Sequence, residues 1–215
     1  MRVSVEEKLA AILVADVFDY ERLVAQDRAG TESALQLHHH EVIDAAIAVY
    51  GGRIFELEPD RTLAEFASPL AAVRCAVEIQ EGLARRMADV PEPERIQLRI
   101  GIHYGEAAVD GGELSGEALT IGKRVHALAE PGEVCVSRTV VEAVRKRVGH
   151  SFEDLAGLPA RPVPKAGLAF LLRPAPETSP RAVTAWLASA GRLVLTAAVA
   201  AAAIWLALTE GRPGP

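Results

Sequence analysis

The sequence KLAAILVAD, residues 8–16, is a nearly continuous apolar run that ends on a carboxylate. Its large apolar side chains cannot all face water, so the run predicts a strand that is buried on at least one face. A strand of this kind places the charge of Asp16 at the rim of a sheet.

A second carboxylate, Asp60, lies in the turn of a predicted hairpin. Residues Arg53–Leu57 and Thr62–Phe66 are its expected strands, and Glu58–Arg61 join them. If the hairpin and the first strand are neighbours, Asp16 and Asp60 lie side by side. Two close carboxylates repel each other unless they share a proton or a cation, which indicates a divalent metal site. The alternative is that both are solvated residues at strand ends and turns.

Length and composition favour one full domain with an appendage. The chain has 215 residues, half of them apolar, which is enough for a sizeable core. Its net charge of −6 argues against binding to nucleic acid. Cys75 and Cys135 fall in a predicted helix and strand, which suits buried reduced thiols; a single disulfide is the alternative.

The hydrophobic pattern predicts an α/β sandwich, with helices packed on a sheet that contains antiparallel strands. Thr31 is the expected cap of a helix that runs to Tyr50, and Ser68-Pro69 begins a second helix. A strand over Ile96–His103 is expected to turn at Gly105 into a further strand. The remaining expected elements are a helix near 117–129, a strand at 133–136, a helix that Ser137 caps, and strands at 152–158 and 168–172.

Three consecutive histidines, His38 to His40, lie within the first of these helices. Such a tract resembles a metal-binding sequence. Consecutive helical positions point in different directions, however, so the pattern favours a solvated surface helix.

The composition changes at the C-terminal end. Residues 1–173 form the predicted globular domain, 174–181 a linker, 182–209 a transmembrane helix and 210–215 a short tail. The span is rich in Ala, Leu and Val, and Trp186 and Trp205 would lie about 28 Å apart along the helix, as an aromatic belt at each interface requires. Arg173, Arg181 and Arg192 on the domain side predict a single-pass membrane protein with a cytoplasmic domain. The alternative is a buried Ala-rich helix.

Six segments together resemble the class III nucleotide cyclase catalytic domain, the adenylate/guanylate cyclase family. They are LAAILVADVFDYERL (9–23), GGRIFELEPDRTLAEF (51–66), AVRCAVEIQ (72–80), RIGIHYG (99–105), GELSGEALTIGKRVHALAEPG (112–132) and FEDL (152–155). The resemblance covers about residues 8–172. It implies a ferredoxin-like sheet-and-helix sandwich that works as a dimer, with active sites shared across the interface.

The reaction that the resemblance implies is attack of the ribose 3′-oxygen of ATP or GTP on the α-phosphate, with release of pyrophosphate. Two divalent ions, Mg²⁺ or Mn²⁺, would be held by Asp16 and Asp60. Arg124 matches the arginine that stabilises charge on the transferring phosphate, and Arg161 falls where the family often has a phosphate-binding lysine.

Several positions depart from the family pattern. The adenine-selecting lysine and its aspartate partner are replaced by Glu56 and Glu113; of these, Glu56 resembles the guanine-selecting glutamate of guanylate cyclases. Thr120 replaces the asparagine that orients the ribose. The glycine that follows the first metal aspartate is Asp19. The glycines that flank the second are Pro59 and Arg61, which give up the conformations that glycine permits.

These departures lead to two functional hypotheses. In the first, the chain is a membrane-anchored cyclase with impaired activity, because a carboxylate about 4 Å from a phosphate costs on the order of 4 kcal/mol near a protein surface. In the second, it is a non-catalytic pseudo-cyclase that acts as a dimerisation or regulatory partner. The dimer would be a homodimer, or a heterodimer in which a second cyclase-like chain supplies the groups that this chain lacks.

Overall fold

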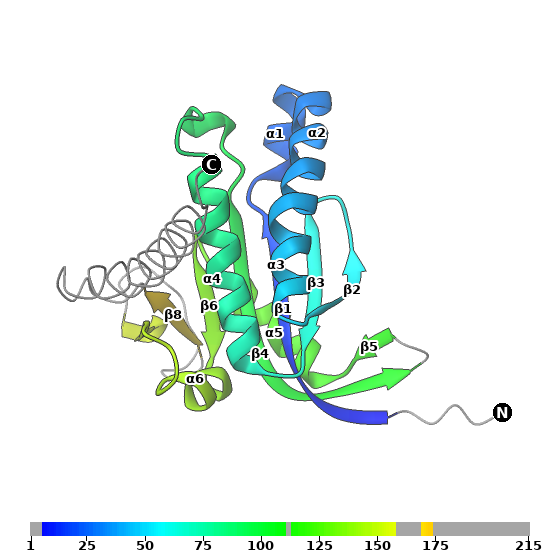
Figure 1. The fold of residues 1–215 in the computed structure, drawn as a ribbon, viewed down its shortest axis with the longest axis vertical. Helices are drawn as coiled ribbons and strands as arrows, with labels where there is room; N and C mark the ends of the chain where they lie inside the picture. Colours follow the sequence, from blue (N-terminus) through cyan, green and yellow to red (C-terminus); the bar gives the residue numbers. More distant parts are fainter. Residues whose placement is uncertain (1–5, 111–112, 158–168, 174–215) are drawn as a thin grey trace, which may run out of the picture. The chain divides into compact units, whose positions relative to one another are not determined.

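The computed structural model describes residues 6–110, 113–157 and 169–173. They belong to one compact unit, Met1–Pro174; a second unit comprises Ala175–Pro215. In the described part, eight strands form one sheet in the order β2-β3-β1-β4-β6-β8-β7, and β5 pairs with β4 (Figure 1). The strands are β1 (Glu6–Val17), β2 (Arg53–Leu57), β3 (Arg61–Phe66), β4 (Leu98–Asp110), β5 (Glu113–Ser115), β6 (Val134–Ser137), β7 (Ser151–Asp154) and β8 (Ala169–Arg173).

Strand β1 lies between β3 and β4 and is antiparallel to both. Because successive side chains of a strand point to opposite faces, β1 divides its residues between two apolar clusters. Leu13, Ala15 and Val17 belong to the larger cluster, and Ile12 and Val14 belong to a smaller one on the other face. The prediction that the apolar run is a buried strand is confirmed, and both of its faces are covered.

Helices cover both faces of the sheet. Figure 1 shows that α2, η1 and α3 form one helical stretch that runs alongside α4 in front of the sheet. Helix α5 contacts β1 and β4 from the other face. The predicted sheet-and-helix sandwich is confirmed. The helices are α1 (Tyr20–Gln26), α2 (Arg28–His38), the π-helix η1 (His39–Asp44), α3 (Ala45–Val49), α4 (Pro69–Arg86), the short 3₁₀ helix η2 (Glu92–Glu94), α5 (Glu117–His126), α6 (Arg138–Val144) and the 3₁₀ helix η3 (Leu155–Gly157).

Two local predictions are wrong. The chain does not turn at Gly105, because β4 stays paired with β1 from Leu98 to Val109. A long partner strand thus overrides the turn preference of glycine. Helix α2 begins before Thr31: its cap is Asp27, whose carboxylate accepts a hydrogen bond from the Gly30 amide at 3.0 Å.

The three histidines differ in their surroundings, so the prediction of a solvated face is wrong for two of them. His38 is buried and His39 is half-buried, whereas His40 is exposed. His39 lies 2.9 Å from the Thr62 hydroxyl and 3.0 Å from the Asp44 carboxylate. They lie where α2 passes into the π-helix, a rare element that often accompanies functional sites.

Strand β2 lies at one edge of the sheet. Its register against β3 shifts between Ile54 and Glu56, which marks a bulge or irregularity. The predicted hairpin of β2 and β3 is confirmed.

The two cysteines of the chain lie in the described part of the structure. Cys75 and Cys135 are free and buried, as predicted, and burial raises the pKa of Cys75 to about 12.

None of the helices in the described ranges is long and apolar enough to cross a membrane. The predicted span 182–209, the linker and the tail all fall outside those ranges, so they remain predictions.

Candidate active site

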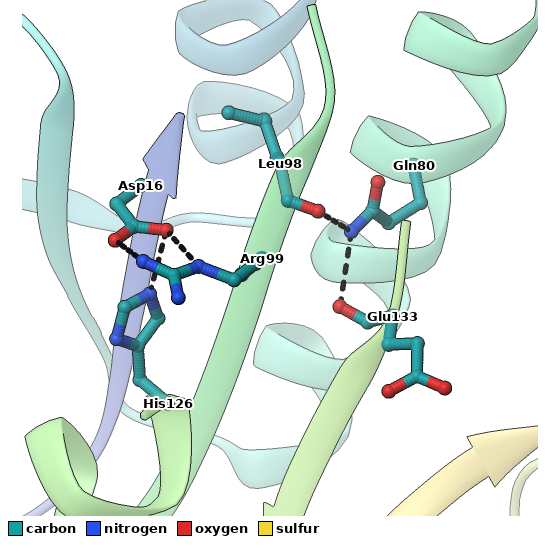
Figure 2. Close-up of polar contacts among 6 residues, drawn as sticks. All are labelled: Asp16, Gln80, Leu98, Arg99, His126 and Glu133. Atoms are coloured by element: carbon teal, nitrogen blue, oxygen red, sulfur yellow. Dashed lines mark hydrogen bonds and ion pairs between the residues drawn. The ribbon is translucent and has the colours of Figure 1, made fainter. Parts of the chain in front are cut away.

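The end of β1 places Asp16 between two strands that carry arginines. Asp16 is paired with Arg61 of β3 on one side and with Arg99 of β4 on the other. Figure 2 shows the Arg99 guanidinium facing the Asp16 carboxylate. Arg99 Nε donates to Oδ1 at 2.9 Å and Nη2 donates to Oδ2 at 2.5 Å. This two-point ion pair occupies both oxygens of the predicted metal ligand.

Helix α5 adds a second cationic or polar group to the same carboxylate. His126 Nε2 lies 3.0 Å from Asp16 Oδ1, and both side chains are mostly buried. Burial by itself would raise the pKa of Asp16, but His126 and Arg99 offset this effect and leave the pKa below its ordinary value. The carboxylate is therefore held in its charged form.

A glycine makes this approach of α5 possible. A Cβ atom on Gly101 of β4 would lie 2.3 Å from the Cα atom of His126. Only a residue without a side chain lets the end of α5 pack this closely on the strand. Gly101 thus helps to position His126 beside Asp16.

Asp60 lies at the same end of the sheet. Its carbonyl oxygen accepts a hydrogen bond from the Val17 amide at 2.8 Å, directly after Asp16 in the chain. The structure therefore brings the two predicted metal ligands to neighbouring backbone positions. Their chemistry suits Mg²⁺ or Mn²⁺, which take one or two carboxylates together with phosphate oxygens. The described residues contain no cluster of three or more His, Cys, Asp and Glu that could hold a metal without such phosphates.

Asp19 follows in the loop between β1 and α1, and its backbone is left-handed, with φ 53° and ψ 41°. Among the described residues other than glycine, it alone has a positive φ. The fold thus retains here the conformation that glycine provides most easily. The Asp19 carboxylate accepts a hydrogen bond from Arg22 Nε at 2.6 Å.

Glu56, the predicted base-reading residue, lies on β2 between two cations. Its Oε1 is 3.6 Å from Arg61 Nη2 and its Oε2 is 3.9 Å from Lys123 Nζ of α5. These are loose, partly exposed pairs. The carboxylate therefore lies close to α5 and is not neutralised by a tight partner.

Thr120 and Arg124 are both exposed and lie one turn apart on α5. The Thr120 hydroxyl donates to the Gly116 carbonyl at 3.2 Å, a bond inside its own helix. Because the buried face of α5 packs on the sheet, Arg124 is presented away from the core. That placement suits contact with a second subunit or a bound molecule.

Two predicted residues lack a described side chain. The backbone of Glu113 pairs with Asp110 in the β4–β5 ladder, and its side chain is outside the described part. Arg161 falls in residues 158–168, also outside it. Their predicted roles in substrate binding are untested.

Sequence reasoning did not identify Arg99 or His126 as neighbours of Asp16. The signal for Arg99 was its position at the start of an alternating strand, opposite a strand that ends on Asp16. Knowledge of the strand order was needed to see it, because 83 residues separate the two positions.

Comparisons with known proteins support one family. A "Putative adenylate cyclase 3" from Rhizobium meliloti is 36% identical over 151 residues, which cover 70% of this chain and 26% of that protein. A serine/threonine-protein kinase, pkn2 of Myxococcus xanthus, is 30% identical over 110 residues, 51% of this chain and 13% of the kinase. The chain thus spans about a quarter or less of these relatives' length. No protein-family model matches it.

Solved structures agree over the whole domain. The adenylate/guanylate cyclase/hydrolase from Silicibacter pomeroyi is 37% identical, with a TM-score of 0.68; the match covers 79% of this chain and 98% of that one. The adenylyl cyclase CyaB from P. aeruginosa, 14% identical, has the same fold with a TM-score of 0.68 over 82% of this chain and all of its own. The chain belongs to the class III adenylate/guanylate cyclase family.

Proposed function

We propose that the chain is a nucleotide cyclase domain that converts ATP or GTP to the 3′,5′-cyclic monophosphate, with impaired turnover. The observation that carries the proposal is that Asp16, at the end of β1, and Asp60, in the β2–β3 turn, lie at neighbouring backbone positions, with Arg99 beside Asp16. Mg²⁺ or Mn²⁺ held by the two carboxylates would polarise the α-phosphate and favour deprotonation of the ribose 3′-hydroxyl.

The remaining steps belong to the chain's own residues. Arg99 can turn its guanidinium from Asp16 to the phosphates, since a phosphate offers the same two-point geometry as a carboxylate. Arg124, exposed on α5, can meet the charge that develops on the α-phosphate of a site in the opposite subunit. Glu56 can accept hydrogen bonds from guanine N1 and N2, which favours GTP.

Two features of the site support the proposal that turnover is impaired. Both oxygens of Asp16 are already paired, so an incoming ion must displace Arg99. The Thr120 hydroxyl is bonded within its helix and is a short substitute for an amide that would orient the ribose. Misplacement of one positioning group typically lowers the rate about 100-fold.

A direct assay tests the proposal. The full chain in detergent is incubated with Mn²⁺ and either ATP or GTP, and the cyclic product is quantified by mass spectrometry. We expect slow product formation that Asp16→Asn abolishes. Asp89→Asn, which changes an exposed carboxylate in a loop, is the matched control and should retain the rate. No product above the Asp16→Asn level would reject a catalytic role.

The second candidate is a pseudo-cyclase that serves as a dimerisation or regulatory partner. The closed Asp16–Arg99 pair favours it, because this pair neutralises the carboxylate without a metal. In that case Asp16→Asn leaves the dimer dissociation constant, measured by sedimentation, unchanged. Weaker association of this variant would argue against the candidate.

We also propose that residues 182–209 anchor the domain to a membrane from the cytoplasmic side. The support is the composition of the segment and the arginines before it. The full chain should stay with membranes after a carbonate wash, whereas a chain that ends at Pro174 should be released. Release of both would remove the anchor.

A further inference from the structure

His39 joins the helical stretch of α2, η1 and α3 to strand β3. Its Nε2 lies 2.9 Å from the Thr62 hydroxyl, and its Nδ1 lies 3.0 Å from Asp44 Oδ1. The side chain of His39 is half-buried, and both Thr62 and the Asp44 oxygen are buried. Water therefore has little access to replace either contact.

The π-helix brings Asp44 to His39. The two residues are five positions apart, and residues with this spacing in an α-helix point about 140° apart around the axis. A π-helix closes each turn with a bond between residues five apart, so their side chains lie on the same side. Helix η1 spans His39–Asp44 and so begins and ends on this pair. The rare element thus places a carboxylate beside the imidazole.

This carboxylate orients the ring. A negative charge 3.0 Å from Nδ1 favours the tautomer that carries its proton on Nδ1. Nε2 is then an acceptor, and the Thr62 hydroxyl donates to it. Because Thr62 is buried, loss of the imidazole would take this partner from its hydroxyl at a cost in free energy. The ring therefore fixes the side chain of Thr62.

Thr62 directly follows the turn that carries Asp60. The turn is closed by a hydrogen bond from the Glu58 amide to the Arg61 carbonyl at 2.8 Å. It is attached to β1 through the Asp60 carbonyl, which accepts from the Val17 amide at 2.8 Å. A restraint on Thr62 is thus passed along two residues of chain to Asp60.

Apolar packing between this turn and the helices is incomplete. A cavity of about 680 Å³ is lined by residues 57–62 of the hairpin and also by residues of α2 and η1. His39 and Thr62 both line it, and they meet at 2.9 Å, so their hydrogen bond bridges the two walls. A polar contact thus restrains the turn where close packing does not.

We infer that His39 is a positioning residue for Asp60. Asp44 orients its ring, the ring holds Thr62, and Thr62 keeps the turn in the place where Asp60 can share a metal ion with Asp16. This role rests on the proposed function, in which both carboxylates hold that ion. The restraint on the turn itself does not depend on metal or nucleotide.

Hydrogen exchange of the Val17 amide reports on the turn without metal or nucleotide, because this amide donates to Asp60. In the full chain in detergent, followed by NMR, His39→Leu should make it exchange about two- to tenfold faster, as loss of one hydrogen bond implies. The Val136 amide is the internal reference, since β6 is separated from β3 by two strands. It should not change.

Two further variants provide rescue and control. His39→Gln offers an amide oxygen that can accept from Thr62, so it should keep the exchange of the Val17 amide slow. His40→Leu changes the exposed neighbour in the same histidine tract and should also have no effect. Urea unfolding checks that each variant folds. If His39→Leu does not fold, Thr62→Val, which removes the hydroxyl and keeps the volume, takes its place.

The affinity for Mn²⁺ tests the positioning of Asp60. The probe is Mn²⁺ with a GTP analogue that has a methylene group between the α- and β-phosphates and cannot be cyclised; bound Mn²⁺ is quantified by electron paramagnetic resonance. We expect His39→Leu to raise the dissociation constant about tenfold, as loss of an outer partner of a metal ligand does. Thr62→Val should do the same. The double variant should lose no more, because both changes break one bond.

Three outcomes would overturn the inference. The first is unchanged exchange of the Val17 amide in folded His39→Leu. The second is a His39→Gln variant that behaves like His39→Leu, and the third is a double variant whose losses add; both would indicate a role in folding alone. If the original chain binds no Mn²⁺ with the analogue, the proposed metal site fails, and the exchange of Val17 alone decides whether His39 restrains the turn.

Discussion

Asp19 stands where the family resemblance implies glycine, and its backbone has the left-handed conformation that glycine adopts easily. A left-handed conformation costs most residues about 1–2 kcal/mol, less for aspartate and nothing for glycine. The surface pair with Arg22 adds at most about 1 kcal/mol. The residue is therefore tolerated here, and the loop before α1 retains its path.

This argument predicts the effect of replacing Asp19. Asp19→Gly should leave the free energy of unfolding within about 1 kcal/mol of the original, because relief of strain and loss of the Arg22 pair oppose each other. Asp19→Val should lower it by about 1–2 kcal/mol, since a β-branched residue resists a positive φ. Urea unfolding measures both, and equal stability of the two variants would contradict the argument.

His103 predicts a pH dependence of stability. Burial lowers its pKa from the ordinary 6.5, and only Glu117 opposes the shift. Below about pH 6.5 the unfolded chain binds a proton that the folded chain resists, so stability is lost as the pH falls through the folded-state pKa. His103→Gln should flatten the curve of unfolding free energy below about pH 6.5.

The control for that prediction is Ser137→Ala. It removes the hydroxyl that lies 2.9 Å from His103 Nδ1 but keeps the titrating ring. Its stability should fall, while the pH dependence remains. Some dependence of the unfolding free energy on pH should persist in the His103→Gln variant, because the pKa of His38 is also lowered.

At the scale of elements, the contact between α5 and β4 determines the geometry of the site. Gly101→Ala would place a methyl group against the backbone of His126, and backbone cannot move aside as a flexible side chain does. We expect a loss of about 1–3 kcal/mol in unfolding free energy, as overpacking causes. Urea unfolding again provides the measurement.

The control at this scale is Gly149→Ala. A Cβ atom there meets nothing within 4 Å, so the substitution should change stability by less than about 0.5 kcal/mol. If Gly101→Ala were equally harmless, the close approach of α5 would not be the reason for the glycine.

The whole molecule makes a prediction about assembly that rests on the proposed function. If Asp16 of one subunit works with Arg124 of the other, then Asp16→Asn and Arg124→Ala are each inactive as homodimers. A mixture forms heterodimers in which one of two sites is intact, so it should recover about a quarter of the original rate. The assay is cyclic nucleotide formation after mixing.

Two results would contradict shared sites. One is a mixture that stays inactive although sedimentation shows that the subunits exchange. The other is an Arg124→Ala homodimer that retains full activity. The first would place the reacting groups within a single chain, and the second would show that Arg124 is not needed for the reaction.

The sequence predicted single strands and the hairpin more reliably than the contacts between distant strands. A continuous apolar run identified β1, and a turn between two short strand-like runs identified the β2–β3 hairpin, because both signals are local. The turn expected at Gly105 failed because pairing with a distant strand decided the conformation. Asp16 and Asp60 could be proposed as a pair, but the ion pair with Arg99 depends on strand order, which no local pattern contains.

The register shift in β2 affects how readily copies of the chain can associate through the edge of the sheet. Exposed outer strands of a sheet offer unpaired amides and carbonyls on which copies of a protein can polymerise. The register shift at Ile54 and Glu56 bends this rim, and Glu56 itself is charged, so neighbouring copies cannot stack there in a regular ladder. The β2 edge is therefore a poor template for fibre formation, although the side chain of Leu57 beside it is exposed.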